Sequence, residues 1–336
     1  MKEVDILIAG AGPAGIACGI ELHRKGRDCL VVDPAAFPRD KLCGGGLTPK
    51  AQKQLDELLP GLRYDYLPVR RMTLYMDGRY RGSYPLVDKE IRIVQRKEFD
   101  ALLLDAYLKE GGAFLQERLG DIREGEDGRL EVTMRSGLQV RCRHLIGADG
   151  ANSRVRLYLN PAARADTLIL EQYSPRCKGE EITIELSRKY PSGYFYIFPN
   201  KRFDAVGYCA ADTRKEVLVS ALKSFGIAET RLQGAFITTR QDYPGHPHIW
   251  LVGDAGGWCD NLSYEGLYFA LATGRNAAHA LLEGRPFRET NAEVMRIKRR
   301  RALGARLLYS RPGLALVKLF SRYPGLTRRI LNRHVY

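Results

Sequence analysis

The chain has 336 residues, of which 45% are hydrophobic and 27% charged, and this composition is typical of a folded globular protein and not of a disordered one. The net charge of +14 gathers at the C-terminus, where residues 285–336 carry 14 Lys and Arg against 2 Glu. The uncharged run over residues 6–20 contains a proline and four glycines, so it is too short and too interrupted to span a bilayer, and no signal-peptide pattern precedes it. Seven scattered cysteines and six histidines lack the spacing of a disulfide framework or a metal site. We therefore expect a cytoplasmic protein without a bound metal.

Residues 4–33 have the pattern of a buried strand, a glycine turn, a helix and a second buried strand that ends at Asp33. Gly10, Gly12 and Gly15 occupy the positions of G-x-G-x-x-G. In that motif the first glycine allows the tight turn, the second lets a pyrophosphate approach the backbone, and the third lets the helix pack closely on the strand. An acidic residue after the second strand is placed to hold a ribose hydroxyl. The segment predicts a dinucleotide site formed by Gly10, Gly12, Ala14, Gly15 and Asp33.

Two later segments each read as a buried strand that ends in a short acidic motif. The first, LIGADGANSRVR at 145–156, ends its strand at Asp149. The second, over 248–284, has a strand ending at Asp254, a loop, and a long helix that begins near Glu265. With the glycine turn, these motifs resemble the FAD-binding fold of the para-hydroxybenzoate hydroxylase type, which carries them in this order. For Asp149 the alternative to a cofactor contact is a turn aspartate that caps the residues after it.

This resemblance implies FAD as the cofactor and a role for each motif. Asp33 would bind the adenosine ribose, Arg96 the phosphate region and Asp254 the ribityl chain. The backbone amides near Gly266 and Leu267 would face the flavin pyrimidine carbonyl, because a helix N-terminus stabilises the negative charge that appears there on reduction.

Cys43 is followed by three glycines in the stretch FPRDKLCGGGLTPKA, which comes after the second nucleotide strand. Residues without side chains allow close approach, so we expect Gly44, Gly45 and Gly46 to lie against the isoalloxazine ring and Cys43 to lie beside its reacting edge. The alternative is a flexible glycine turn with an incidental thiol.

The segment PSGYFYIFPNK alternates in a way that predicts a strand. Tyr194, Tyr196 and Phe198 would point to one face of this strand, and Phe195 and Ile197 to the other. We interpret the first face as an aromatic wall that contacts the substrate, with ordinary sheet core as the alternative.

The stretches KLCGGGLTPKA and YFYIFPN together resemble the motifs K-x-C-G-G-G-L-T-P-K-A and Y-x-W-x-F-P-K of geranylgeranyl reductases, over residues 1 to about 285. Tyr196 stands in the Trp place and Asn200 in the Lys place. The resemblance implies saturation of double bonds in a polyprenyl lipid: reduced FAD would deliver hydride to one alkene carbon, and the other would receive a proton. Cys43 is the candidate proton donor or relay, and an apolar slot around it would favour the protonated thiol.

The loop GDAGGWCDNLSYEG also departs from the geranylgeranyl reductase pattern, with Asn261 in the place of a proline and Tyr264 in the place of a glycine. A flavin monooxygenase or halogenase on the same fold is the nearest alternative, although the W-x-W-x-I-P signature of tryptophan-type halogenases is absent. An alternative of another class is a membrane-associated flavin electron carrier. Neither a second dinucleotide fingerprint nor a ferredoxin patch is evident, so NAD(P)H and ferredoxin both stay open as the electron donor.

The predicted fold class is α/β, with an FAD-binding Rossmann-like domain of the para-hydroxybenzoate hydroxylase type, an antiparallel-sheet substrate domain and a helical C-terminal tail. These three parts are expected over 1–65, 95–160 and 245–285 for the discontinuous FAD domain, 66–94 and 161–244 for the substrate domain, and 286–336 for the basic tail.

Pro312 and Pro324 divide the tail into short helical pieces. A basic amphipathic tail can lie on anionic lipid, so we expect peripheral binding to a membrane surface, with a helical face packed on the FAD domain as the alternative. Nucleic-acid binding is not expected, because no recognised nucleic-acid module accompanies the charge. The expected apolar stripes comprise Leu303, Leu307, Leu316, Phe320, Tyr323, Leu326 and Ile330, beside Lys318, Arg322, Arg328, Arg329 and Arg333.

Overall fold

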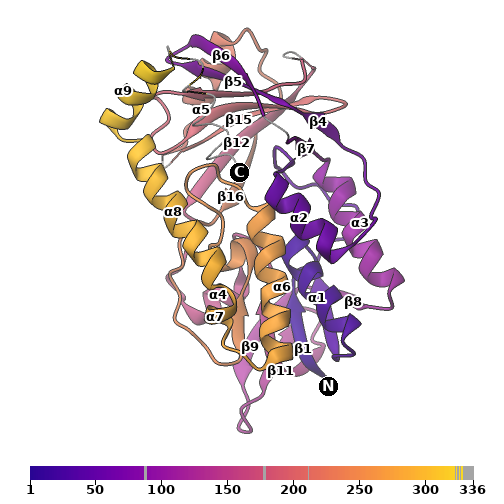
Figure 1. Ribbon diagram of the computed structural model, residues 1–336. Helices are drawn as coiled ribbons and strands as arrows, with labels where there is room; N and C mark the ends of the chain where they lie inside the picture. The colour runs from indigo at the N-terminus through magenta and orange to yellow at the C-terminus, as the bar shows by residue number, and fades with distance from the viewer. Residues whose placement is uncertain are drawn as a thin grey trace.

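The computed structural model describes residues 1–86, 89–176, 179–210, 212–321, 323, 325 and 327. Within these residues, the lower half of the molecule in Figure 1 is built on a seven-stranded mixed sheet. Its parallel part contains the strand–turn–helix–strand unit predicted from the glycine motif, and two antiparallel strands extend one edge. The order is β8 (Ala113–Gln116), β2 (Cys29–Asp33), β1 (Lys2–Ala9), β11 (Gln139–Gly147), β10 (Leu130–Met134) and β9 (Leu119–Glu124), with β17 (Ile249–Leu251) paired to β11.

Helices cover one face of this sheet and form the main core. Successive residues of β1 point to opposite faces, so Ile6 and Ile8 join the helices while Leu7 packs on the other side. The helix that contains Ala14 and the helix that contains Gly274 pack so closely that a Cβ at Gly274 would lie 2.1 Å from the Ala14 carbonyl oxygen. The helices on this face are α1 (Pro13–Arg24), α2 (Pro49–Leu58), α3 (Arg96–Lys109) and α6 (Leu267–Glu283), and α4 (Arg154–Leu159) lies on the opposite face.

A second seven-stranded sheet forms the upper half of Figure 1. It is antiparallel except where β13 and β5 run parallel, and α5 (Lys215–Ser224) packs on one of its faces. The α/β fold with an FAD-type nucleotide half and an antiparallel-sheet half is thereby confirmed. The order is β16 (Gln233–Ile237), β12 (Thr167–Ser174), β15 (Asp204–Ala210), β14 (Tyr194–Pro199), β13 (Ile182–Leu186), β5 (Arg71–Met76) and β6 (Arg79–Pro85).

The segment 66–94 does not enter the second sheet as a whole. Its last strand, β7 (Ile91–Ile93), is the centre of a separate three-stranded sheet and pairs with β3 (Gly46–Leu47) on one side and with the segment's first strand, β4 (Leu67–Val69), on the other. The strand that begins at the third glycine is therefore tied by backbone hydrogen bonds to the end of the segment that the sequence pattern assigned to the substrate domain.

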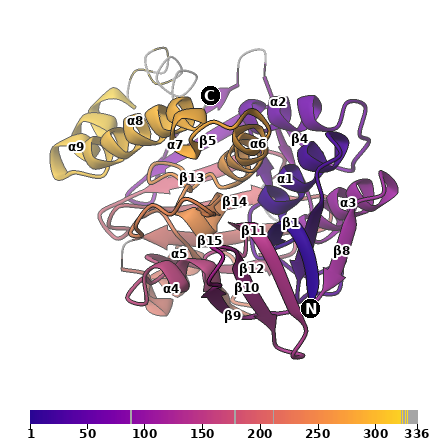
Figure 2. The ribbon, with the colours of Figure 1, turned by 90° about the horizontal axis from the view of Figure 1, so that it is seen from below.

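The C-terminal helices are α7 (Phe287–Thr290), α8 (Ala292–Leu308) and α9 (Arg311–Phe320), and Figures 1 and 2 show α8 and α9 lying along one side of the molecule. Ser310 caps α9, its hydroxyl oxygen accepting a hydrogen bond from the Gly313 amide at 3.0 Å, and Leu314 packs into the core of the second sheet. No helix among the described residues is long and apolar enough to cross a membrane. Several residues of the expected tail pattern lie outside the described residues: Arg322, Pro324, Leu326, Arg328, Arg329, Ile330 and Arg333.

Candidate cofactor and substrate site

A cavity of about 1110 Å³ lies between the two sheets. It extends from the turn between β1 and α1, past the three glycines, to the second sheet and to α8 and α9. Of the site residues predicted from the sequence, Gly15 is outside the lining, because it packs against the Gly10 carbonyl. The others line the cavity: Gly10, Gly12, Ala14, Asp33, Cys43, Gly44, Gly45, Arg96, Asp149, Asp254, Gly266, Leu267, Tyr194, Tyr196 and Phe198.

The turn before α1 leaves a bare stretch of backbone beside the cavity. Gly10 has φ +112°, and a side chain there would lie 2.3 Å from the Ala148 carbonyl oxygen. A Cβ on Gly12 would have only the Arg39 guanidinium near it, at 3.6 Å. The first turn of α1 has no side-chain cap, so its N–H groups suit the pyrophosphate of a dinucleotide. Arg39 also lines the cavity beside this turn, and the sequence patterns did not single it out.

Two aspartates at strand ends hold the adjacent loops with their carboxylates. Asp33 accepts hydrogen bonds from the Ala11 amide at 2.8 Å and the Ala35 amide at 2.9 Å. Asp149 Oδ2 accepts from the Arg154 amide at 2.7 Å, while its Oδ1 is buried without a partner among the described residues. Burial raises the pKa of Asp149 above its usual value. Asp149 thus caps the following turn through Oδ2, and a hydroxyl-bearing cofactor is a chemical match for its unpartnered Oδ1.

Arg96 and Cys43 lie together, which changes the expected surroundings of the thiol. The Arg96 guanidinium makes two 2.8 Å hydrogen bonds to Asp100, so its charge is balanced within the protein. The Cys43 sulfur is half-buried beside Arg96 and accepts a hydrogen bond from the Gly45 amide at 3.4 Å. The slot around this sulfur is therefore polar on one side and not uniformly apolar as expected. Cys43 and Cys259 are both free thiols.

The glycines after Cys43 let the second sheet approach the nucleotide half. A Cβ on Gly44 would lie 2.9 Å from the Phe198 ring, and one on Gly46 would lie 3.3 Å from it. Gly45 accepts a backbone hydrogen bond from Val94 at 3.0 Å, which holds the segment against the small sheet. Contact of these glycines with the isoalloxazine ring stays a prediction.

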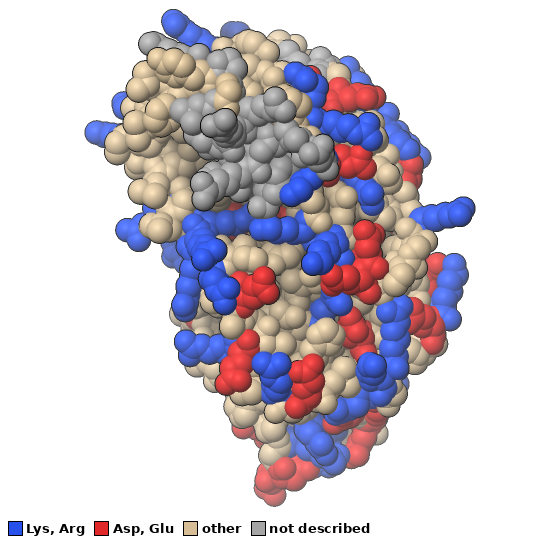
Figure 3. Space-filling model, in the orientation of Figure 1, with Lys and Arg blue, Asp and Glu red and all other residues tan. Residues whose placement is uncertain are grey.

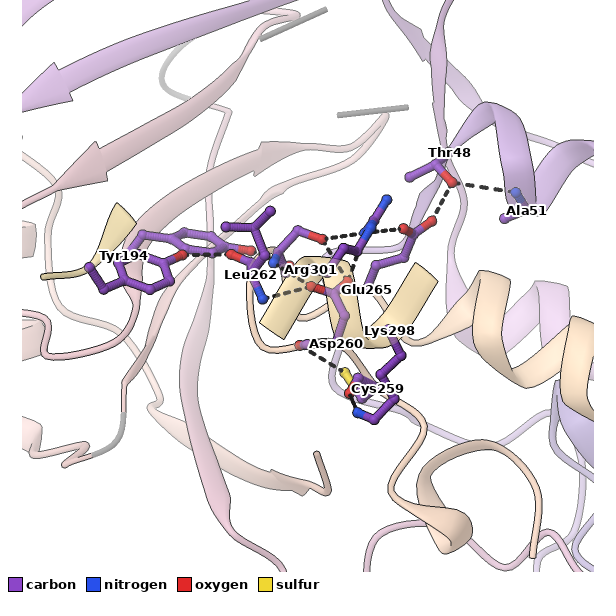
Figure 4. Close-up of polar contacts among 11 residues, drawn as sticks. Thr48, Ala51, Tyr194, Cys259, Asp260, Leu262, Glu265, Lys298 and Arg301 are labelled. Atoms are coloured by element: carbon purple, nitrogen blue, oxygen red, sulfur yellow. Dashed lines mark hydrogen bonds and ion pairs between the residues drawn. The ribbon is translucent and has the colours of Figure 1, made fainter. Parts of the chain in front are cut away.

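The loop over residues 253–266, called the cofactor loop below, ends at the N-terminus of α6. It begins with the 3₁₀ turn η1 (Gly253–Gly256), which places Asp254 at the cavity, and a Cβ on Gly266 would lie 3.5 Å from Asp254 Oδ1. The first turn of α6 has no side-chain cap and no acidic residue. Glu265 turns its carboxylate away toward Arg301 and Thr48, as Figure 4 shows. The amide end of α6 is thus left facing the cavity for an electron-rich ligand group.

The aromatic strand β14 forms part of the cavity wall. Tyr194, Tyr196 and Phe198 lie on the cavity face, while Phe195 and Ile197 pack with α5 on the other face. The wall continues into the C-terminal helices, because Leu308, Tyr309 and Val317 line the cavity and belong to the same hydrophobic cluster. This contribution was not apparent from the sequence, where the tail was treated as a separate basic segment.

A buried tyrosine–glutamate pair lies on the same face of the sheet as this wall. Tyr196 is paired with Gly207, and Gly207 with Glu171, across three neighbouring strands. Because Gly207 has no side chain, the Tyr196 hydroxyl crosses β15 and donates a hydrogen bond of 2.7 Å to Glu171 Oε2. Glu171 Oε1 has no partner among the described residues, and burial raises the pKa of Glu171 from 4.5 to about 7.

Glu171→Gln is expected to change how stability depends on pH. Between pH 4.5 and 7 the folded protein holds a proton on Glu171 that the unfolded chain releases, so the free energy of unfolding should fall by about 3 kcal/mol across this window. The glutamine variant should lack this fall. Urea unfolding at several pH values measures the difference. Glu185→Gln, which alters the other buried tyrosine–glutamate pair, should keep the fall, and equal slopes for Glu171→Gln and the parent would contradict the prediction.

Among the residues that the structure describes, no cluster of His, Cys, Asp and Glu has the arrangement of a metal site. The strongest polar cluster missed by sequence reasoning is that of Lys298 and Arg301 on α8, which contact the cofactor loop. They stand in the basic run RIKRRR beside Arg299 and Arg300, which are exposed. No pattern in the sequence distinguishes the two buried residues, Lys298 and Arg301, from the two exposed ones.

The fold and the family match define a flavoprotein oxidoreductase, and its nucleotide half and antiparallel sheet enclose the cavity. A family model described as an FAD binding domain matches residues 3–221, and the chain belongs to this family. It is an FAD-dependent oxidoreductase of the geranylgeranyl reductase-like group.

Two relatives are similar to the chain in sequence, and one solved structure is similar to it in fold. The menaquinone reductase of Mycolicibacterium smegmatis is 31% identical over 319 residues, covering 84% of this chain and 77% of that protein. The geranylgeranyl diphosphate reductase of Rhodobacter capsulatus is 27% identical, covering 83% and 75%. A geranylgeranyl bacteriochlorophyll reductase-like protein of Thermoplasma acidophilum has the same fold, with a TM-score of 0.79 at 19% identity over 99% of this chain and 100% of that one.

Proposed function

We propose that the protein uses FAD to saturate carbon–carbon double bonds of a polyprenyl lipid. The observation that carries the proposal is the continuity of one cavity from the nucleotide turn to a wall of aromatic and aliphatic side chains. The relatives named for reducing menaquinone and geranylgeranyl diphosphate support the same class of substrate.

An isolated alkene is weakly polarised, so positioning and exclusion of water must supply much of the rate. When bound, reduced FAD supplies two electrons and one hydrogen to the double bond. The protein supplies the second hydrogen as a proton. Cys43 is proposed as the donor or relay, because its half-buried sulfur lies at the cavity next to the glycines. Tyr194, Tyr196 and Phe198 are proposed to hold the isoprenoid chain against them.

The proposal is tested by giving chemically reduced protein a panel of prenyl lipids without oxygen and following the products by mass spectrometry. We expect a gain of two hydrogens for each saturated bond. Oxygen consumption with a hydroxylated or halogenated product would favour the monooxygenase or halogenase alternative. Passage of electrons to an acceptor with every lipid unchanged would favour the electron carrier. Anaerobic mixing with NADH, NADPH or reduced ferredoxin identifies the electron donor by which one bleaches the bound FAD.

We also propose that α8 and α9 bind an anionic membrane surface next to the lipid cavity. Leu303, Leu307, Leu316 and Leu319 are 58%, 64%, 50% and 48% exposed. In Figure 3 the surface over α9, at upper left, is mostly uncharged, with basic side chains around and below it. Each basic residue near such a surface contributes about 1 kcal/mol, and salt screens this attraction. Gly304 and Leu307 also line the cavity, so binding of α8 and α9 to a membrane would place the cavity beside the membrane that holds the lipid substrate.

Replacing Leu303, Leu316 and Leu319 together by Gln is expected to weaken binding to phosphatidylserine-containing vesicles at low salt, measured by co-sedimentation. Gln at the exposed Leu108 and Leu138 is the matched control and should leave binding unchanged. Deleting the whole tail is not a clean test, because it would also remove the buried Lys298 and Arg301. Absence of vesicle binding by the parent protein at low salt would overturn the membrane proposal alone.

A further inference from the structure

The helix α8 carries two buried basic side chains, one turn apart, that reach into the cofactor loop. Lys298 is 7% exposed, and its ammonium group donates to the carbonyl oxygens of Thr239 at 2.8 Å and Cys259 at 2.6 Å. Arg301 is 8% exposed and contacts the same loop further along. The C-terminal helix is therefore joined to the loop that ends at the amide end of α6.

Arg301 holds two buried acids of this loop at once. Its Nη1 donates to Asp260 Oδ2 at 2.8 Å, to Glu265 Oε2 at 2.7 Å and to Ser263 Oγ at 3.0 Å (Figure 4). Asp260 is fully buried and also accepts from the amides of Leu262 at 2.7 Å and Ser263 at 2.8 Å. Without Arg301, two carboxylates would lie buried and close together with no cation between them.

The second carboxylate extends the network to the glycine segment. Glu265 accepts a hydrogen bond from the Thr48 hydroxyl, and Thr48 caps α2 by accepting from the Ala51 amide at 3.4 Å. Thr48 lies two residues after Gly46, and Glu265 directly precedes Gly266. The Arg301–Glu265–Thr48 chain thus spans the cavity edge between the two backbone segments that the sequence motifs assign to the flavin ring.

We propose that Arg301 is a positioning residue that sets the distance between the glycine segment and the amide end of α6, and through them tunes the binding and reduction potential of FAD. The geometry carries this inference: Arg301 from a distant helix holds the Glu265 carboxylate, and Glu265 in turn accepts the hydrogen bond of Thr48 beside the glycine segment. Removal of Arg301 would free Glu265 and so loosen the link between the two segments. The inference rests on FAD binding and not on the choice of lipid substrate, so it survives if the prenyl-lipid proposal fails.

The test compares Arg301→Met with Arg300→Met, an exposed neighbour on the same helix. The dissociation constant for FAD should rise about 10-fold or more in Arg301→Met, the scale of a lost hydrogen bond to a charged group. Its reduction potential should become more negative, because Glu265 beside the cavity loses the cation that balances its charge. Arg301→Lys should recover only part of the affinity for FAD. It keeps the positive charge, but its ammonium group cannot reproduce the guanidinium contacts with both Asp260 and Glu265.

Glu265→Gln provides a second variant if Arg301→Met does not fold, because it keeps the size of the side chain and the Arg301–Asp260 pair. It should weaken FAD binding as well, but shift the potential in the opposite direction, because it removes a negative charge. A purely structural role predicts lower thermal stability with an unchanged FAD dissociation constant and an unchanged potential in both variants. That result would overturn the proposal, and it is measured without any substrate.

Discussion

Gly10→Ala is expected to yield a folded protein that has lost most of its FAD. The new Cβ would lie 2.3 Å from the Ala148 carbonyl oxygen and 2.9 Å from the Asp149 amide nitrogen. Both neighbours are backbone atoms, so they cannot swing away as a side chain could. The residue would also keep φ +112°, a conformation that costs an ordinary residue about 1–3 kcal/mol. Relief of the clash must displace the turn that lies beside the pyrophosphate, and flavin absorbance per folded protein measures the loss.

Gly26→Ala is the matched control for this substitution. Gly26 also has a positive φ, +66°, but this value lies in the left-handed region that alanine can adopt at a smaller cost, and nothing lies within 4 Å of its Cβ. This variant should lose some stability and keep its FAD. Circular dichroism of both variants separates cofactor loss from unfolding. If Gly10→Ala retains flavin as well as Gly26→Ala does, the glycine turn is not part of the cofactor site.

Cys43→Ser is expected to keep FAD and to slow double-bond saturation by about 10²-fold or more, if the thiol is the proton donor or relay. Serine preserves the size of the side chain and its contact with the Gly45 amide. A hydroxyl is a far weaker acid than a thiol, so the proton transfer should slow while substrate binding is kept. Single-turnover saturation by pre-reduced protein isolates this step from reduction of the cofactor.

Cys142→Ser is the control for Cys43→Ser, because Cys142 is buried in the core on the other face of the nucleotide sheet. It should change stability without changing the single-turnover rate. Equal single-turnover rates for the parent and Cys43→Ser would show that the Cys43 thiol does not supply the proton and only lines the cavity. The partly polar surroundings of its sulfur, beside Arg96, make this a demanding test of the assignment.

Sequence patterns predicted the local parts of the site because each part is built from neighbouring residues. The β1–turn–α1–β2 unit, for example, depends on hydrophobic periodicity and three glycines within 15 residues of the N-terminus. The alternation in β14 likewise placed Tyr194 and Tyr196 on one face and Phe195 on the other. The resemblance to known flavoproteins then ordered these parts into a fold.

Other features arise from contacts between residues far apart in the chain. The glycines at 44 and 46 leave room for the Phe198 ring, and Gly207 leaves room for the Tyr196 hydroxyl to reach Glu171. A local pattern cannot report such a fit, because the residues concerned lie on different strands, and Glu171 lies 25 residues from Tyr196. The pairing of the strands decides which glycine leaves room for a side chain from another strand.

The sequence by itself determined the nucleotide-binding turn, the FAD-type order of motifs and the aromatic face, since each depends on residue spacing along one short segment. The tertiary structure decided that Asp149 caps a turn through one oxygen and leaves the other without a partner among the described residues, and that the tail forms part of the cavity wall. It also showed that Arg301 is buried while its neighbour Arg300 is exposed. Burial and the position of two acids from another segment distinguish these side chains, and neither property can be read from a run of identical residues.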